Sequence, residues 1–365
     1  MWIMPSEFDQ ILVSDSPMVD VRAPLEYAKG SFPRATNLPL LQDDERARVG
    51  YCYKQQGQSA AVVLGHQLVC GAIKQSRLAA WVAFVQQHQD AIFYCFRGGL
   101  RSHTIQQWLQ ESGYDMRFIT GGYKALRQHV LKTIECLVEQ LPMFVISGYT
   151  GVGKTDLLIR LYRYLDLEAL ANHRGSSFGR LPGGQPGQVD FENKLAIKLL
   201  QLRQDGLQPL SIEDESRLIG QCMLPPGLQN KLKSTAIVLL EAPLHERVDR
   251  IWRDYIQQAL PFYEQQYQHH AVYAFGRVLQ DNLSRIHKRL GTRTHGEISR
   301  LLDHALLEHH RLGDPIGHRV WIKALLERYY DPLYEYQLSK KQARVIFRGD
   351  ANAVYNWLQQ ACNVT

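Results

Sequence analysis

The sequence predicts two α/β domains, each built on a parallel sheet, and a largely helical segment at the end of the second domain. Three observations predict this fold class. The chain has 365 residues, enough for two buried cores at roughly 150 residues per domain. Strand-like and helix-like segments alternate over the first 130 residues, which indicates a parallel sheet covered by helices. The same alternation starts again at Met143, after a connecting helix.

Short apolar runs predict the strands of the first domain. They cover 18–21, 90–94 and 118–119, and helices are predicted over 78–87 and 100–111. Gly113 stands where the second of these helices should end, because glycine accepts the left-handed backbone of a helix C-cap. The apolar stretch 60–71 is interpreted as a buried core helix, with the lining of a hydrophobic ligand pocket as the alternative.

A helix over 123–137, ended by Pro142, is interpreted as the connector. The predicted boundaries are therefore 1–130 for the first domain, 131–142 for the connecting helix and 143–365 for the second domain. In the second domain we expect strands over 143–147 and 235–241 and a helix over 156–164. The segment 172–188 is rich in Gly, Ser, Arg and Pro and predicts a long loop, and from Leu244 onward the pattern is mostly helical.

Composition excludes several other classes of protein. The six cysteines include no C-x-x-C pair, which argues against a disulfide framework or a zinc site of that spacing and favours reduced thiols in a cytosolic protein. The first residues lack a signal-peptide pattern, and no apolar run is as long as a membrane span. We therefore expect a cytoplasmic protein with no membrane partner. The net charge of +6 permits a nucleic-acid partner without requiring one.

A cysteine stands between a predicted strand and a predicted helix, in a basic, glycine-rich loop. The helix N-terminus and two arginines favour the nucleophilic thiolate, and the loop N–H groups can bind an anion. A buried structural cysteine is the less favoured alternative. We predict that Cys95, Arg97 and Arg101 are catalytic. The residues predicted to complete the anion-binding loop are Phe96, Gly98, Gly99, Leu100 and Ser102.

A phosphate-binding loop follows the strand at 143–147, and its sequence matches G-x-x-x-x-G-K-[ST]. The predicted phosphate-binding residues are Gly148, Tyr149, Thr150, Gly151, Val152, Gly153, Lys154 and Thr155. Lys154 would neutralise phosphate charge, and Thr155 would coordinate Mg²⁺ if that ion is bound. The carboxylate that such a site needs could come from 210–217 or from 238–243, and neither segment is an apolar strand ending in Asp. Anion binding is therefore better supported than nucleotide hydrolysis.

Other polar groups are candidates for holding substrate. Arg174, Ser176 and Arg217 are possible residues of a clamp for phosphate or RNA, although a disordered surface loop explains 172–180 equally well. The acids of 190–193 are interpreted as charges at a helix N-terminus. Basic and aromatic residues interleave over 285–348, as in RNA-binding surfaces, but amphipathic helices with aromatic core residues explain most of them better.

Residues 19–39 and the Cys95 loop together resemble rhodanese domains over roughly the first 130 residues. The matching stretches are Val19-Asp20-Val21-Arg22-Ala23-Pro24-Leu25-Glu26-Tyr27, the segment 30–39, and Cys95 with its loop. This resemblance implies that Cys95 carries a chalcogen atom as a persulfide-type intermediate. The Cys-x5-Arg spacing is one residue longer than in the usual sulfurtransferase loop and resembles the loops of cysteine-dependent phosphatases. A larger loop fits a phosphate group or a selenium atom better than a lone sulfur.

A rhodanese unit fused to a P-loop unit resembles the tRNA 2-selenouridine synthase family over essentially the whole chain. The stretches 174–179, 191–193 and 213–217 add to the match. The resemblance implies a transferase that replaces the sulfur of 2-thiouridine at tRNA wobble position 34 with selenium from selenophosphate. It implies an S-geranylated intermediate made from geranyl diphosphate, a perselenide on Cys95 and no tightly bound cofactor. It also implies binding of the anticodon arm of Lys, Glu and Gln tRNAs and a prenyl pocket near Gly65.

Two functional questions stay open at this point. The P-loop could hold geranyl diphosphate, which is our hypothesis, but ATP or GTP fits the motif equally well. The alternatives to the family function are an ATP-dependent tRNA sulfurtransferase or kinase fused to a rhodanese carrier, and a rhodanese-type phosphatase or regulatory module. The presence of Cys95 argues against an inactive module, and the lack of a conventional acid near its loop argues against a phosphatase.

Overall fold

The computed structural model describes residues 1–181 and 183–363. Pro182, which belongs to the predicted loop 172–188, lies outside the described residues. The chain divides into two compact units. Unit 1 comprises Met1–Leu137 and Pro186–Asp205, and unit 2 comprises Val138–Gln185 and Gly206–Thr365.

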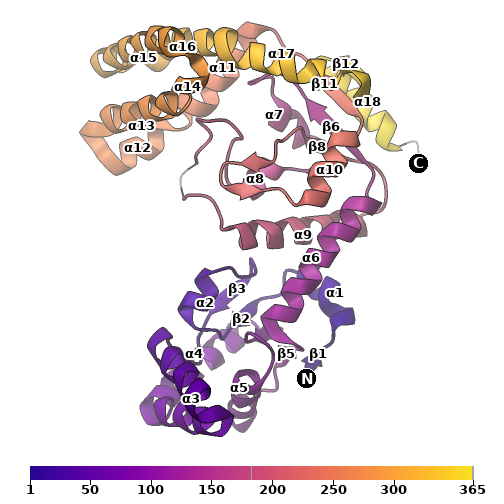
Figure 1. The fold of residues 1–365 in the computed structure, drawn as a ribbon, viewed down its shortest axis with the longest axis vertical. Coiled ribbons are helices and arrows are strands. Elements are labelled where there is room, and N and C mark those ends of the chain that lie inside the picture. The colour runs from indigo at the N-terminus through magenta and orange to yellow at the C-terminus, as the bar shows by residue number, and fades with distance from the viewer. Residues whose placement is uncertain (182, 364–365) are drawn as a thin grey trace. The chain divides into compact units, whose positions relative to one another are not determined.

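Unit 1 contains a five-stranded sheet in the order β1-β5-β4-β2-β3, and all of its strand pairs are parallel (Figure 1). Its strands are β1 (Trp2–Ile3), β2 (Met18–Asp20), β3 (Ala35–Asn37), β4 (Ile92–Tyr94) and β5 (Arg117–Ile119). Its helices are α1 (Phe8–Val13), α2 (Pro24–Ala28), α3 (Asp43–Leu68), α4 (Gly71–Gln87), α5 (Leu100–Glu111), α6 (Gly122–Gln140), which continues into unit 2, and α9 (Gln188–Gln204). The predicted helix 100–111 and the left-handed Gly113 after it are confirmed.

Unit 2 contains a second five-stranded parallel sheet, in the order β12-β11-β6-β8-β7. Its strands are β6 (Met143–Ser147), β7 (Tyr164–Leu165), β8 (Leu210–Glu213), β11 (Ile237–Leu240) and β12 (Val345–Gly349), and a hairpin of β9 (Leu218–Ile219) and β10 (Cys222–Met223) lies outside this sheet. The edge strand β12 falls in the segment expected to be helical. Its residues are half-buried at every second position, and the ring of Phe347 stacks on that of Trp357 with 5.3 Å between centroids.

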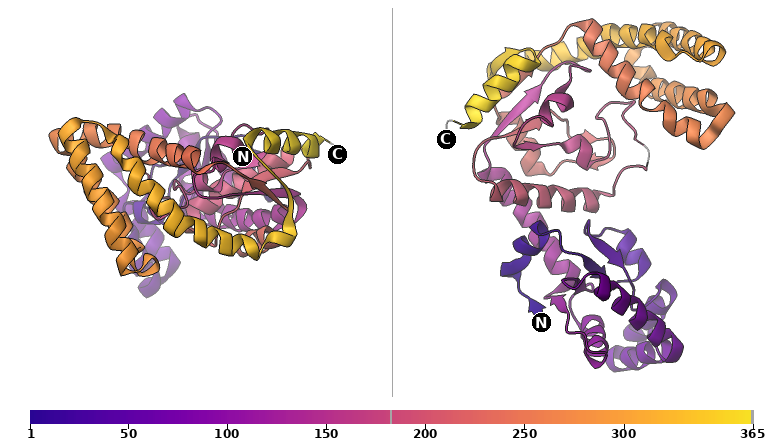
Figure 2. Two further views of the ribbon diagram at one scale, coloured as in Figure 1. Left: turned by 90° about the horizontal axis from the view of Figure 1, so that it is seen from above. Right: turned by 180° about the vertical axis from the view of Figure 1, so that it is seen from behind.

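The remainder of unit 2 is helical, as the sequence predicts (Figure 2). Its helices are α7 (Lys154–Leu158), α8 (Leu167–Leu170), α10 (Pro226–Ser234), α11 (Leu244–Trp252), α12 (Leu260–Tyr267), α13 (Ala271–Arg285), α14 (His287–Leu290), α15 (Thr292–Leu312), α16 (His318–Leu325), α17 (Asp331–Ser339) and α18 (Ala351–Asn363), and short π-helical turns at Arg253–Gln257 and Leu326–Tyr330 follow α11 and α16. Trp321 and Tyr329 belong to the buried core of this part. Their role is therefore packing, as the simpler interpretation of the interleaved aromatics expects.

Two predictions about helices are wrong. The helix expected over 156–164 ends at Leu158, because the chain tightens into turns that lead to β7 beside β8; Arg160 and Leu161 donate to carbonyls three residues back, at 3.1 and 3.0 Å. The stretch 60–71 is helical as far as Leu68 but is not a buried core helix, because Val63 is 57% exposed. Among the described residues no single helix is long and apolar enough to cross a membrane, and α3 and α4 pass that test only as a pair bent by 84°.

Helix α9 packs in unit 1, although it lies in the sequence between segments of unit 2. Asp190 accepts a hydrogen bond from the Ser31 N–H at 2.7 Å, and Asn193 donates to the Ser31 carbonyl at 2.7 Å. Arg127 pairs with Glu192 and also donates to Asn193. The expectation that these acids serve only as helix N-terminal charges is therefore wrong, because they bind groups that are distant in the sequence.

Candidate active-site loops

Residues at the start of α6 hold the Cys95 loop in place through hydrogen bonds to its backbone carbonyls. Strand β4 ends directly before Cys95, whose side chain is 2% exposed. The N–H groups of Tyr123 and Lys124 donate to the carbonyls of Cys95 and Phe96 at 2.8 and 3.0 Å. A Cβ on Gly122, where φ is +60°, would lie 2.4 Å from the Cys95 carbonyl oxygen, so only glycine permits this close approach. The loop carbonyls therefore face α6.

The N–H groups of the loop are left without partners. Within the described part of the chain, no group accepts a hydrogen bond from the backbone N–H of any residue from Phe96 to Ser102. Unpaired backbone N–H groups are costly unless water or a ligand satisfies them. Consecutive free N–H groups at the start of a helix are suited to binding an anion, which is the role that the sequence predicts for this loop.

The two arginines predicted to be catalytic have different surroundings. Arg101 donates from Nη1 to Glu26 Oε2 at 2.7 Å. Burial would raise the pKa of Glu26, but the hydrogen bond and charge of Arg101 hold that pKa below its ordinary value. Arg97 is exposed, lies 5.9 Å from the centroid of the Phe96 ring and forms no ion pair with the described residues. Arg97 is thus the arginine that is free for an anion, whereas Arg101 is already paired.

A buried ion pair supports the strand next to the loop. Arg22 and Asp20 form an ion pair at 2.6 Å, with side chains 2% and 0% exposed. The Arg22 guanidinium also lies 3.7 Å from the centroid of the Tyr123 ring and donates to the Gly30 carbonyl at 2.8 Å. Tyr123 supplies one of the N–H groups that hold the loop, so this cluster helps to position Cys95.

The P-loop turns tightly between β6 and α7. Lys154 folds back and donates from Nζ to the Gly148 carbonyl at 3.2 Å. Gly151 has a φ of +78°, and a Cβ there would lie 2.8 Å from the Arg247 carbonyl on α11. Glycine at this position is therefore needed both for the backbone conformation and for the close packing of α11 against the loop.

Thr155 meets a carboxylate from the neighbouring strand. Its hydroxyl donates to Glu213 Oε1 at 3.0 Å, and Glu213 is the last residue of β8, beside β6. Glu241, the carboxylate that the sequence left open as the alternative, lies 3.8 Å from Arg348, with its side chain 49% exposed. Of the two candidate segments, 210–217 thus supplies the carboxylate that contacts the P-loop.

Further acids surround this contact. Burial, together with the charges of Asp166 and Glu215, raises the pKa of Glu213 to about 8. Burial, together with the charges of Glu213 and Glu215, raises the pKa of Glu168 to about 9. A hydroxyl at the start of α7 and a carboxylate at the end of β8 fit Mg²⁺, for which Thr155 and Glu213 would be the protein ligands. The described residues contain no group of three or more His, Cys, Asp and Glu arranged for a metal, so phosphate oxygens and water would supply the other ligands.

Helices α11 and α17 contact the outer side of the P-loop. Arg247 donates from Nη1 and Nη2 to the two carboxylate oxygens of Asp331, each at 2.7 Å, and to the Thr150 carbonyl at 3.3 Å. Tyr149 donates its hydroxyl to Glu335 at 3.2 Å. The sequence contains no signal for Asp331 or Glu335, which lie more than a hundred residues after the loop.

Comparison with known proteins assigns both units. The family model described as "tRNA 2-selenouridine synthase AAA domain" matches residues 141–364, and that described as "Rhodanese-like domain" matches residues 4–129. The chain belongs to the tRNA 2-selenouridine synthase family. The fold class predicted from the sequence, a rhodanese-like domain followed by a P-loop domain with a helical end, is confirmed.

Three relatives carry the name "tRNA 2-selenouridine synthase". The protein from Shewanella loihica is 47% identical over 98% of this chain and 96% of its own length. The protein from Shewanella woodyi is 46% identical over 99% of this chain and 98% of its own length. The protein from Pseudomonas fluorescens is 48% identical over 97% of this chain and 98% of its own length.

In this member of the 2-selenouridine synthase family, two of the three predicted clamp residues are anchored to the helix after α11. Arg174 donates to the Asp254 carbonyl at 2.8 Å and to Gln258 Oε1 at 3.1 Å. The Ser176 hydroxyl lies 3.1 Å from that of Tyr255. The loop that carries them is therefore packed against protein rather than free. Arg217 is exposed, and its Nη2 lies 3.5 Å from the Met223 sulfur, so the structure does not bring it together with the other two.

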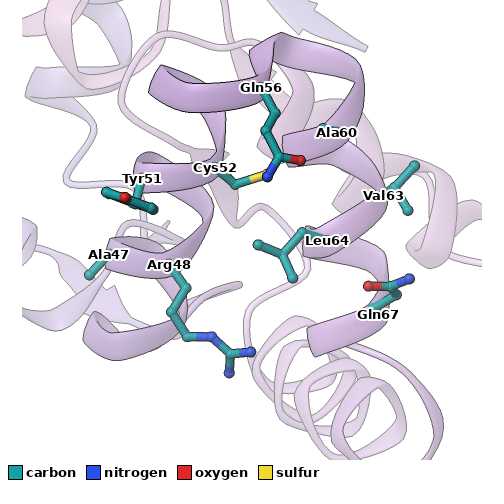
Figure 3. Close-up of a pocket in the computed structure, with 9 residues that line it drawn as sticks. All are labelled: Ala47, Arg48, Tyr51, Cys52, Gln56, Ala60, Val63, Leu64 and Gln67. Carbon is teal, nitrogen blue, oxygen red and sulfur yellow. The ribbon is translucent and has the colours of Figure 1, made fainter.

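A cavity lies beside Gly65, the residue singled out for the prenyl chain. Helix α3 bends at Gly57, where φ is +86°, and the cavity of about 740 Å³ lies between the limbs 43–56 and 58–68 (Figure 3). Gly65 itself does not line it. The lining residues are Ala47, Arg48, Tyr51, Cys52, Gln56, Ala60, Val63, Leu64 and Gln67. The bend thus leaves apolar side chains of α3 uncovered by the core.

Proposed function

We propose that this protein modifies tRNA by exchanging the sulfur of 2-thiouridine at wobble position 34 for selenium. The name shared by the relatives supports this substrate and product. The observation that carries the proposal is the presence of two different anion loops in one chain. One has a cysteine at its base, and the other is a P-loop in contact with Glu213. An exchange that uses one phosphate-bearing donor and one diphosphate-bearing donor needs two such loops.

The chemistry explains why a prenyl donor would be used. A thiocarbonyl sulfur on a pyrimidine is a poor leaving group. Alkylation of that sulfur makes C2 electrophilic and allows a thiol to leave. In this proposal, geranyl diphosphate alkylates the sulfur, and the P-loop with Lys154 and Thr155 holds the departing diphosphate. ATP and GTP remain the competing ligands for this loop.

The cavity in α3 is our candidate for the geranyl chain. Its apolar residues Ala60, Val63 and Leu64 lie next to Gly65 in the sequence. The cavity volume of about 740 Å³ is within the range of small-molecule sites.

The Cys95 loop is the proposed site for selenophosphate. Its free N–H groups and Arg97 are donors for phosphate oxygens, and Cys95 is the nucleophile that breaks the selenium–phosphorus bond. The resemblance to rhodaneses predicts that selenium is then carried as a perselenide. The proposed tRNA partners are the Lys, Glu and Gln isoacceptors, and the proposed location is the cytoplasm.

Mass analysis of wobble nucleosides tests this function. Thiolated tRNA is incubated with the protein, geranyl diphosphate and selenophosphate, and each co-substrate is omitted in turn. We expect S-geranyl-2-thiouridine without selenophosphate and 2-selenouridine with both donors. Cys95→Ala should stop at the geranylated nucleoside, whereas Cys70→Ala, at an exposed cysteine, should complete the reaction. The proposal fails if the wild type forms neither nucleoside, or if selenation requires ATP instead of geranyl diphosphate.

A further inference from the structure

We propose that Cys95 attacks the phosphorus of selenophosphate rather than its selenium, so that a phosphocysteine forms and hydrogen selenide is released beside the tRNA. This inference rests on the proposed function, in which selenophosphate is the selenium donor. It concerns which bond Cys95 makes, and it replaces the perselenide expected from the rhodanese resemblance.

The donors around the loop match a phosphoryl group. The backbone N–H groups from Phe96 to Ser102 have no acceptor among the described residues, and the carbonyls of Cys95 and Phe96 are turned toward α6. Three phosphoryl oxygens can use several donors converging from one loop, whereas a single selenium atom can use one or two. The Cys-x5-Arg spacing has one residue more than the usual sulfurtransferase loop. The larger loop therefore also favours a phosphoryl group over a single selenium atom.

A buried hydroxyl adds an independent observation. Ser102 is 0% exposed, stands in the first turn of α5 directly after Arg101, and its Oγ has no hydrogen-bond partner in the described part of the chain. A buried hydroxyl without a partner is costly, and a ligand bound in the adjoining loop would satisfy it. We assign Ser102 as a residue that donates to the phosphoryl group bound in this loop.

The electron balance of the two possible reactions favours attack of Cys95 Sγ on phosphorus. If Sγ attacks selenium, the Se–P electron pair leaves on phosphorus and phosphite is formed. The selenium is then two electrons too oxidised for a selenocarbonyl, and a thiol reductant must restore it. If Sγ attacks phosphorus, the S–P bond forms, the P–Se pair leaves with selenium as hydrogen selenide, and no oxidant or reductant is needed. Water then cleaves the S–P bond to give orthophosphate and the Cys95 thiol.

The remaining steps also balance. Hydrogen selenide adds to C2 of the S-geranylated uridine, geranylthiolate leaves with the C2–S electron pair, and the selenium-bound proton neutralises that thiolate. The lack of a conventional acid near the loop is consistent with this route. Glu26, the carboxylate that contacts Arg101, stays ionised because that contact lowers its pKa. An alkoxide leaving group needs a general acid, but the much less basic selenide does not.

Rapid-quench labelling tests the proposal. The wild-type protein is mixed with S-geranylated anticodon stem-loop RNA and selenophosphate radiolabelled at phosphorus, and the reaction is stopped at alkaline pH within the first turnover. We expect the label on the peptide that contains Cys95, followed by orthophosphate in step with 2-selenouridine. The phosphoryl and selenium adducts have nearly equal masses, so the radiolabel identifies the group. Formation of phosphite, or of orthophosphate without any labelled Cys95 peptide, would overturn the proposal.

A pair of serine variants on one helix supplies the control. Ser102→Ala should slow label incorporation about tenfold, the loss of one hydrogen bond to a charged phosphoryl group. Ser102→Thr, which keeps the hydroxyl, should restore the rate. Ser112→Ala, at the other end of α5, removes a hydroxyl that donates to the Trp108 carbonyl and should not change the rate. If selenation proceeds with phosphite as product, this inference alone fails. If selenophosphate is not consumed at all, the proposed function fails with it.

Discussion

Thr155 of the P-loop donates its hydroxyl to Glu213 across 3.0 Å, and this contact joins the loop to the neighbouring strand β8. A hydroxyl and a carboxylate in this arrangement are suited to a divalent cation that neutralises a diphosphate. We therefore propose that the carboxylate of Glu213, rather than that of Glu241, is the acid that supports chemistry at the P-loop.

We predict that Glu213→Gln lowers the initial rate of S-geranylation about 100-fold, because a neutral amide cannot balance the charge of a cation at the leaving diphosphate. Selenation of RNA that is already geranylated should continue at the wild-type rate. Glu241→Gln, at a carboxylate that lies half-exposed beside Arg348, is the matched control. Nucleoside mass analysis measures both reactions. A Glu213→Gln enzyme with full geranylation activity would contradict the assignment.

The ion pair between Arg247 and Asp331 should be important for stability. Their side chains are 6% and 16% exposed. Asp331→Ala leaves the buried guanidinium without its partner, so we expect a loss of about 3–5 kcal/mol in the free energy of unfolding of unit 2. Urea denaturation, monitored by tryptophan fluorescence, measures this loss. As control, Glu297→Ala removes surface pairs with Arg293 and Arg328 and should change stability far less, because exposed ion pairs contribute little. Equal effects of both substitutions would show that the buried pair has no special role.

A pH dependence of stability follows from His318. Its side chain is fully buried, Trp321 Nε1 donates to its Nδ1 at 2.9 Å, and its other ring nitrogen lies 3.3 Å from Nδ1 of His309. Burial and the neighbouring His309 lower the pKa of His318 from 6.5 to about 4.

The sign of this pH effect follows from proton binding. Between pH 6.5 and 4 the unfolded chain binds a proton that the folded chain does not, so stability is complete above 6.5 and falls with decreasing pH. The loss should reach about 3 kcal/mol near pH 4. Thermal unfolding over this range measures it, and His318→Gln should flatten the profile. His304 is exposed, so the stability profile of His304→Ala should match that of the wild type. A flattened profile for His304→Ala would argue against His318 as the group that causes the pH dependence.

We predict that the prenyl chain of geranyl diphosphate binds in the α3 cavity. Leu64→Asp puts a charge among its apolar lining residues and should raise KM for geranyl diphosphate about tenfold or more, because desolvating a carboxylate costs at least 1.4 kcal/mol. The rate of selenation of geranylated RNA should change much less. Ile73→Asp, on α4, introduces the same charge at an apolar residue that is already 46% exposed and should leave KM unchanged. Equal KM values for both variants would place the prenyl site elsewhere.

Local sequence was sufficient to predict both anion loops and most of the strands that carry them. A strand, a glycine-rich turn and a helix start are consecutive in the chain, and so the Cys95 loop and the P-loop could be located from neighbouring residues alone. The same local reasoning extended α7 too far, because the end of that helix depends on pairing between β7 and β8.

Contacts between distant segments could not be predicted in this way. The sequence offered both 210–217 and 238–243 as the source of the carboxylate, and only the pairing of β6 with β8 brings Glu213 to Thr155. Asp331 has no local pattern that distinguishes it from any other surface acid, and α17 brings it to Arg247. Likewise, the sequence predicts only that a helix begins near Asp190, and the contacts of α9 with Ser31 and Arg127 assign it to unit 1.

By itself, the sequence predicted the two-domain α/β organisation, Cys95 as the nucleophile and a phosphate loop over 148–155, because each prediction depends on residues that are adjacent in the chain. Tertiary structure alone decided which acid contacts Thr155, which arginine of the Cys95 loop has no acidic partner among the described residues, and that the loop N–H groups have no acceptor among them. These features depend on hydrogen bonds between residues that are tens of positions apart in the chain. Such bonds form only where the packing of helices on the parallel sheets brings the partners together.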